Sequence, residues 1–145
     1  MSKQTYVVGV DGSEWSERAV SRAINLAQQT QAQVNLVYII DWSGHESLTL
    51  EEMAHRDEDK QAQLAKIQAD VLDSLTSEYQ DSGVDITTNI LWGKPAIMLH
   101  EHSKKSRANM IFVGRRGRSV IANLITGSTA DKLVHIVGLP IVLVP

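Results

Sequence analysis

The chain has 145 residues, of which 43% are hydrophobic and 21% charged, and its formal net charge is −3. That length fits one domain with a core of ordinary size, and the acidic balance argues against nucleic-acid binding, which needs a basic surface. The chain has no cysteine for a disulfide or thiolate metal site, no apolar run of membrane-spanning length and no signal-peptide pattern, so we expect a cytoplasmic protein.

The first third of the chain predicts a strand, a helix and a second strand. Thr5–Val10 is a β-branched and aromatic run, which predicts a buried strand. Asp11-Gly12-Ser13 forms a turn with a hydroxyl that can cap a helix, and apolar residues then recur at helical spacing to about Thr30. Gln33–Ile40 predicts the second strand, and the polar residues of Trp42–Glu46 predict a loop.

The middle of the chain predicts one long helix and a sheet edge. A helical stripe runs through residues 48–80 and includes Leu64, Leu75 and Tyr79. Its polar segment, His55–Gln63, is either a solvated start of the helix or a mobile loop. Val84–Leu91 predicts a third strand, and its weaker apolar content is typical of a strand at a sheet edge.

The last third predicts two helices and two strands. Gly93-Lys94-Pro95 introduces a helix over residues 96–106, with proline in its first turn. Asn109–Val113 predicts the fourth strand, a final helix carries an apolar stripe that includes Leu133 and Val134, and Ile141–Val144 predicts the fifth strand. Five strands that alternate with four helices predict a single α/β domain with a parallel, doubly wound sheet.

The most informative pattern is a glycine loop between the fourth strand and the last helix. Gly114-Arg115-Arg116-Gly117 is followed after nine residues by Gly127-Ser128-Thr129, with Ser128 at the expected N-cap. Strand, glycine loop and helix N-terminus together bind phosphate in α/β proteins. The glycines would let backbone amides approach an anion, and Arg115, Arg116 and Arg118 would add positive charge. The alternatives are that the glycines only form turns and that the arginines are solvated.

Two further residues follow or end strands that would face this loop. Ligands in an open α/β sheet bind beyond the carboxyl ends of the strands, near the switch in strand order. If the first and fourth strands are neighbours, Asp11 and Ile39 lie beside the glycine loop. Asp11 would bind a ribose hydroxyl or a hydrated metal ion, or else serve as a turn or N-cap residue, and Ile39 would offer backbone groups to a base. The chain contains no P-loop, dinucleotide fingerprint or nucleophile elbow.

These residues resemble the universal stress protein family in its ATP-binding branch, over essentially the whole chain. The similarity includes Gly9-Val10-Asp11-Gly12-Ser13, the strand end Tyr38-Ile39-Ile40-Asp41 and the helix entry Gly93-Lys94-Pro95-Ala96. It is most specific at the family's nucleotide signature G-x2-G-x9-G-[S/T], which Gly114, Gly117, Gly127 and Ser128 satisfy in full.

The resemblance implies a Rossmann-like, five-stranded sheet of order 3-2-1-4-5. It implies a bound ATP, AMP or ADP with the adenine near Val10 and Ile39, the ribose near Asp11, the phosphates along the glycine loop, and Mg²⁺ held mainly by the phosphates. The expected nucleotide-binding residues are Val10, Asp11, Ser13, Ile39, Val113, Gly114, Arg115, Arg116, Gly117, Arg118, Ser119, Gly127, Ser128 and Thr129.

The resemblance also implies homodimers that pair through the last strand, Ile141–Val144, or larger oligomers. The function expected from it is a regulatory one, in which the nucleotide state modulates a protein partner. Two alternatives stay open at this point. One is a slow ATPase or other nucleotide-handling enzyme, although no general base and no arginine-plus-lysine set for phosphoryl transfer is evident. The other is a chaperone-like or structural dimer whose glycine loop binds no nucleotide.

Overall fold

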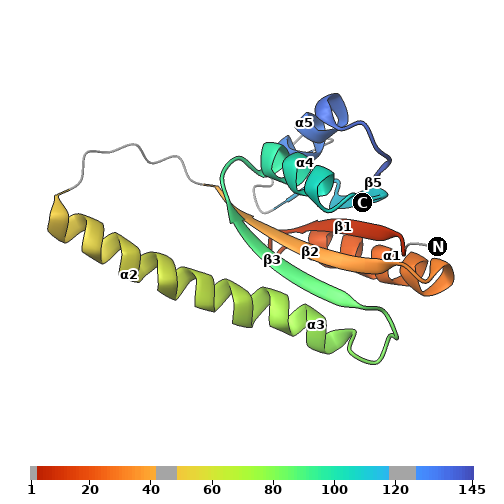
Figure 1. Cartoon of the computed structure of the whole chain (residues 1–145), viewed down its shortest axis with the longest axis horizontal. Helices are drawn as coiled ribbons and strands as arrows, with labels where there is room; N and C mark the ends of the chain where they lie inside the picture. The colour runs from red at the N-terminus through yellow and green to blue at the C-terminus, as the bar shows by residue number, and fades with distance from the viewer. Residues whose placement is uncertain (1–2, 42–48, 118–126) are drawn as a thin grey trace.

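The computed structural model describes residues 3–41, 49–117 and 127–145, which form an α/β domain around a parallel five-stranded sheet (Figure 1). The strand order is β3-β2-β1-β4-β5. This order and the parallel pairing confirm the prediction. The strands are β1 (Thr5–Val10), β2 (Gln33–Ile40), β3 (Ile86–Trp92), β4 (Met110–Gly114) and β5 (Ile141–Val144).

The helices cover both faces of the sheet, as expected for a doubly wound fold. On one face, α1 and a long helix pack over an apolar cluster that includes Val8, Leu36 and Leu72. On the other face, α4 and α5 enclose Val7, Val37 and their neighbours. The helices are α1 (Glu14–Thr30), the long helix made of α2 (Leu50–Ile67), a π-helical segment η1 (Gln68–Asp73) and α3 (Ser74–Glu78), then α4 (Pro95–Lys105) and α5 (Ser128–Ile136).

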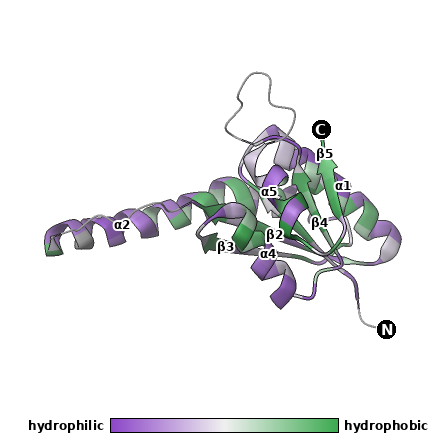
Figure 2. Ribbon diagram, turned by 90° about the horizontal axis from the view of Figure 1, so that it is seen from above, coloured by the Kyte–Doolittle hydropathy of each residue, from purple (hydrophilic) through white to green (hydrophobic). Residues whose placement is uncertain are grey.

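The π-helical segment lets one long helix keep its apolar side on the sheet. Ile67 and Leu72 are both buried, yet residues five apart lie roughly 140° from each other around an α-helix. The wider turn of η1 reduces that separation, and Leu75 then continues the buried side. The polar segment His55–Gln63 is helical, so the structure favours the solvated helix over the mobile loop. The hydrophilic outer turns of α2 extend beyond the sheet (Figure 2).

The remaining differences from the sequence predictions concern boundaries and one buried residue. β3 begins at Ile86, two residues later than expected, and β4 ends at Gly114, one residue later. Val134 was placed on the apolar stripe of the last helix, but 48% of it is exposed. That prediction is wrong because, within the described residues, α5 packs with its inner side, which Ala130 and Leu133 occupy.

The position of β1 creates the switch point of the sheet. β1 pairs with β2 on one side and with β4 on the other, in register Val8↔Leu36 and Val8↔Phe112. After β1 and after β4, the chain therefore continues toward opposite faces of the sheet. An opening remains between the loops at the carboxyl ends of these two strands. No helix in the described part of the chain is long and apolar enough to cross a membrane.

Candidate functional site

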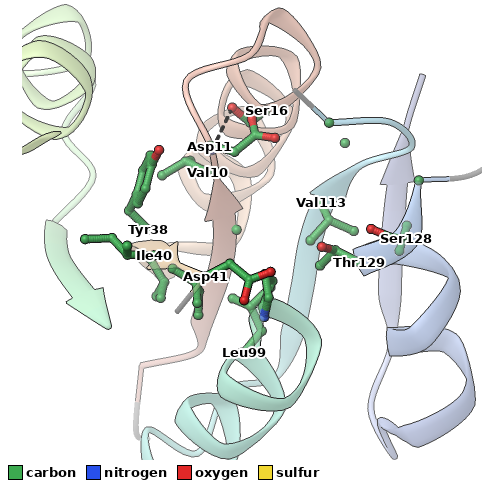
Figure 3. Close-up of a pocket in the computed structure, with 18 of the residues that line it drawn as sticks. Val10, Asp11, Ser16, Tyr38, Ile40, Asp41, Leu99, Val113, Ser128 and Thr129 are labelled. Atoms are coloured by element: carbon green, nitrogen blue, oxygen red, sulfur yellow. Dashed lines mark hydrogen bonds between the residues drawn. The ribbon is translucent and has the colours of Figure 1, made fainter. Parts of the chain in front are cut away.

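A cavity of about 390 Å³ lies at the carboxyl ends of β1, β2 and β4, at the switch point (Figure 3). Its volume is within the range of small-molecule sites. Side chains from β1, β2 and β4 and from the N-termini of α4 and α5 surround it. Ten of the predicted site residues line it: Val10, Asp11, Ile39, Val113, Gly114, Arg116, Gly117, Gly127, Ser128 and Thr129.

The turn after β1 fixes the carboxylate of Asp11 at the cavity. The Ser13 amide and hydroxyl both donate to Asp11 Oδ1, at 2.9 and 2.5 Å. The Asp11 amide donates to Ser16 Oγ at 3.3 Å. The Ser13 hydroxyl also accepts from the Ser16 amide as the N-cap of α1. Asp11 is therefore a turn residue that also faces the cavity, whereas Ser13 is not among the residues that line it and supports Asp11 from behind.

Glycine is required in this loop because neighbouring atoms lie close to the backbone, and not because of turn geometry. None of Gly114, Gly117 and Gly127 has a positive φ, so a bare turn does not account for them. A Cβ at Gly114 would lie 2.7 Å from Trp15 Cβ, and one at Gly117 would lie 2.7 Å from Asp11 Oδ2. The first glycine thus lets α1 pack on β4, and the second lets the loop pass beside the Asp11 carboxylate.

The N-terminus of α5 opens toward the cavity without a side-chain cap. Ser128 was expected as the N-cap, but the cap is Gly127 and Ser128 is the first helical residue. That prediction is wrong because the Gly127 amide donates to the Arg115 carbonyl oxygen, at 2.7 Å, and Gly127 takes the cap position, so that the helix starts one residue earlier than expected. The first amides of α5 have no side-chain acceptor among the described residues, and Ser128 and Thr129 line the cavity. Such a helix end attracts anions.

The arginines of the loop separate into two positions. Arg116 lines the cavity, and its Nε atom is buried with no hydrogen-bond partner among the described residues. A buried guanidinium nitrogen without an acceptor fits a site for a phosphate or carboxylate. The Arg115 side chain is exposed and does not line the cavity, while its amide donates to the Val144 carbonyl oxygen at 2.8 Å. Arg118 and Ser119, also expected at the site, lie outside the described residues.

Several lining residues were not predicted from the sequence as ligand contacts. Tyr38, Ile40 and Asp41 come from the end of β2, and Asp41 forms an ion pair with Lys94 at 3.8 Å. Their position at a strand end was a usable signal, whereas no local pattern indicated Gln63 of α2. The other unpredicted lining residues are Gly9, Ser16, Val37, Pro95, Leu99 and Ala130. The predicted loop Trp42–Glu46 lies outside the described residues.

Comparison with known proteins matches the chain to one protein family. A family model described as "Universal stress protein family" matches residues 4–145. The chain is 28% identical over 139 residues to universal stress protein MJ0531 of Methanocaldococcus jannaschii, covering 95% of this chain and 79% of that protein.

Two solved structures have the same fold. A universal stress protein in complex with cAMP has a TM-score of 0.71 at 25% identity, covering 100% of this chain and 98% of that one. The universal stress protein from Archaeoglobus fulgidus in complex with dAMP has a TM-score of 0.66 at 19% identity, with both chains covered completely.

Proposed function

Because the chain belongs to the universal stress protein family, we propose that it is a regulatory protein that binds an adenine nucleotide in the switch-point cavity. One observation carries the proposal: the N-terminus of α5, which has no side-chain cap among the described residues, lines the same cavity as Arg116, whose buried Nε has no hydrogen-bond partner among those residues. Both groups favour a phosphate. The complexes of similar proteins with cAMP and dAMP support adenine as the base.

The nucleotide would lie across the cavity from α5 to β2. Its phosphates would contact Arg116 and the amides of Ser128 and Thr129, and its ribose hydroxyls would donate to Asp11. The base would pack against Val10 and Ile39, which offer apolar atoms and, at Ile39, backbone groups at a strand end. This placement gives the polar and apolar ends of the ligand matching surroundings.

The ligand would be ATP, ADP or AMP, with Mg²⁺ held mainly by the phosphates. Regulation requires that the nucleotide bind two states of the protein with different affinity. A homodimer through β5 would provide such states. β5 is an edge strand whose Ile141, Val142 and Leu143 are only partly buried, and an apolar edge of this kind favours pairing with another chain. Arg115 hydrogen-bonds to Val144, which would connect this edge to the glycine loop.

The test combines nucleotide identification with a matched pair of variants. Mass spectrometry of small molecules released from the purified protein identifies any co-purified nucleotide, and calorimetry with AMP and ATP gives affinities. Arg116→Ala should weaken binding by about tenfold or more, since a hydrogen bond to a charged group contributes roughly 1.5–3 kcal/mol. Arg115→Ala removes the same charge one residue away and should have a smaller effect. No binding by the unmodified chain, or equal losses in both variants, would contradict the proposal.

A turnover assay separates this regulatory function from an enzymatic one. The two carboxylates that line the cavity among the described residues, those of Asp11 and Asp41, come from the ends of β1 and β2 and not from α5, so we expect hydrolysis of ATP far below the roughly 10 per second of typical enzymes. Turnover in that ordinary range would favour the nucleotide-handling enzyme instead.

A further inference from the structure

A second hollow, the α2 groove, adjoins the switch-point cavity beneath α2 and η1. Its volume is about 360 Å³. Asp11, Tyr38 and Gln63 line both hollows, so the groove borders the cavity along these residues. A mononucleotide that spans the cavity from α5 to β2 leaves the groove without an occupant.

The groove has an apolar floor and a polar rim. Tyr38 and Ile67, which are 7% and 8% exposed, form the floor together with Val71. Exposed Lys66 and Asp70 stand at the rim. An aromatic and aliphatic floor under hydrogen-bonding groups suits a flat heterocycle such as a nucleobase.

The charges of the groove argue against a second group of phosphates. Among the described residues that line the groove, the charged groups are the carboxylates of Asp11 and Asp70 and the ammonium of Lys66, so these residues carry no surplus of positive charge. One bridging phosphate diester carries a single charge, which Lys66 can neutralise. This charge balance therefore favours a base attached through one phosphodiester over a polyphosphate.

The geometry of the junction indicates where the second base would be attached. In the cavity, Tyr38 and Ser128 lie on opposite sides, with Val10 and Asp11 between them (Figure 3). The groove therefore opens on the side away from the α5 end. The turn after β1 borders it directly, since a Cβ at Gly12 would lie 3.6 Å from Val71 Cγ2. A substituent that reaches the groove would leave the ribose beside Asp11, and not the phosphate end.

We propose that the α2 groove binds the second base of a ribose-linked adenine dinucleotide whose first nucleotide occupies the switch-point cavity. The inference rests on the proposed function for the placement of the first nucleotide. It goes beyond that function because it assigns the ligand class and gives α2 a direct role in binding. The 5′-phosphate would lie at α5, the ribose at Asp11, the linking phosphate near Lys66, and the second base on Tyr38 and Ile67.

Calorimetry with three ligands tests the proposal on the full chain. The ligands are AMP, adenosine 3′,5′-bisphosphate, and the 5′-phosphorylated dinucleotide pApA. We expect pApA to bind about tenfold more tightly than the other two ligands, a factor that corresponds to roughly 1.4 kcal/mol and lies within the range of one stacked base. AMP that binds while pApA gains nothing over the bisphosphate would overturn the inference and leave the proposed function intact. Failure of all three ligands would overturn both.

Two charge-reversal variants test where the second base binds. Lys66→Glu should reduce the affinity for pApA to that for AMP and leave AMP unchanged. Lys104→Glu makes the same charge change on an exposed residue of α4 that does not line the groove, and it should alter neither affinity. An equal loss of AMP in Lys66→Glu would assign the groove to the mononucleotide itself, and an unchanged pApA affinity would place the second base elsewhere. Either result overturns the inference.

Discussion

Replacement of Gly117 by alanine should weaken nucleotide binding through Asp11. The added methyl group would lie 2.7 Å from Asp11 Oδ2, closer than van der Waals contact allows. The carboxylate must rotate to make room, but Ser13 holds Oδ1 through donations of 2.9 and 2.5 Å. Rotation weakens these bonds, and a hydrogen bond to a charged group contributes about 1.5–3 kcal/mol.

The same substitution at Gly114 should act on stability instead. Its methyl group would lie 2.7 Å from Trp15 Cβ and 2.8 Å from the Arg116 carbonyl oxygen. Neither atom can rotate away, so α1 must shift from β4. Overpacking of this kind costs about 1–3 kcal/mol, which for a chain of this size lowers the melting temperature by roughly 2–12 °C. For Gly117→Ala, loss of one charged hydrogen bond predicts a decrease of about 3–12 °C.

Thermal unfolding and calorimetry with AMP measure the two effects separately. If rotation of Asp11 loses one charged hydrogen bond to AMP, the affinity of Gly117→Ala for AMP should fall by about tenfold, since roughly 1.4 kcal/mol corresponds to a factor of ten. Gly138→Ala is the control, because apart from its chain neighbours no described residue has an atom within 4 Å of the Cβ position at Gly138. Unchanged affinity and stability in Gly117→Ala would refute the role of the Asp11 contact, and a Gly114→Ala protein as stable as the control would refute the packing argument.

Three further predictions concern stability and are measured by urea unfolding. Ser13→Ala removes the N-cap of α1 and the donor to Asp11, so we expect a loss of about 1 kcal/mol; a loss no larger than that of an exposed serine would contradict it. Leu72→Ala empties a fully buried position of η1 and should cost about 2–5 kcal/mol, and a loss below 1 kcal/mol would show that the long helix packs loosely. Burial, and secondarily the Lys105 charge, lowers the pKa of His102 from its ordinary 6.5. The unfolded chain therefore binds more protons below about pH 6.5, so stability should fall as the pH decreases through that value, and His102→Gln should flatten the decrease.

The sequence by itself determined the class of fold and the place of the candidate site. Thr5–Val10, Gln33–Ile40 and Ile141–Val144 form strands with the predicted bounds, because β-branched runs between turn residues are a local signal. The strand order was implied by the resemblance of the sequence to the universal stress protein family, and the structure confirms this order. The glycine spacing located the loop that borders the cavity, although the role of its residues as ligand contacts stays a prediction.

Only the tertiary structure decided what each residue of the site touches. Gly114 packs against Trp15, Gly117 passes Asp11, and Gln63 reaches the cavity from a distant helix. None of these contacts has a local signature, because each joins residues that are remote in the sequence and are brought together by the packing of the sheet. The start of α5 at Ser128 likewise depends on a hydrogen bond between Gly127 and Arg115 across the loop. Periodicity and propensity act over a few residues, whereas these features depend on the distances between elements.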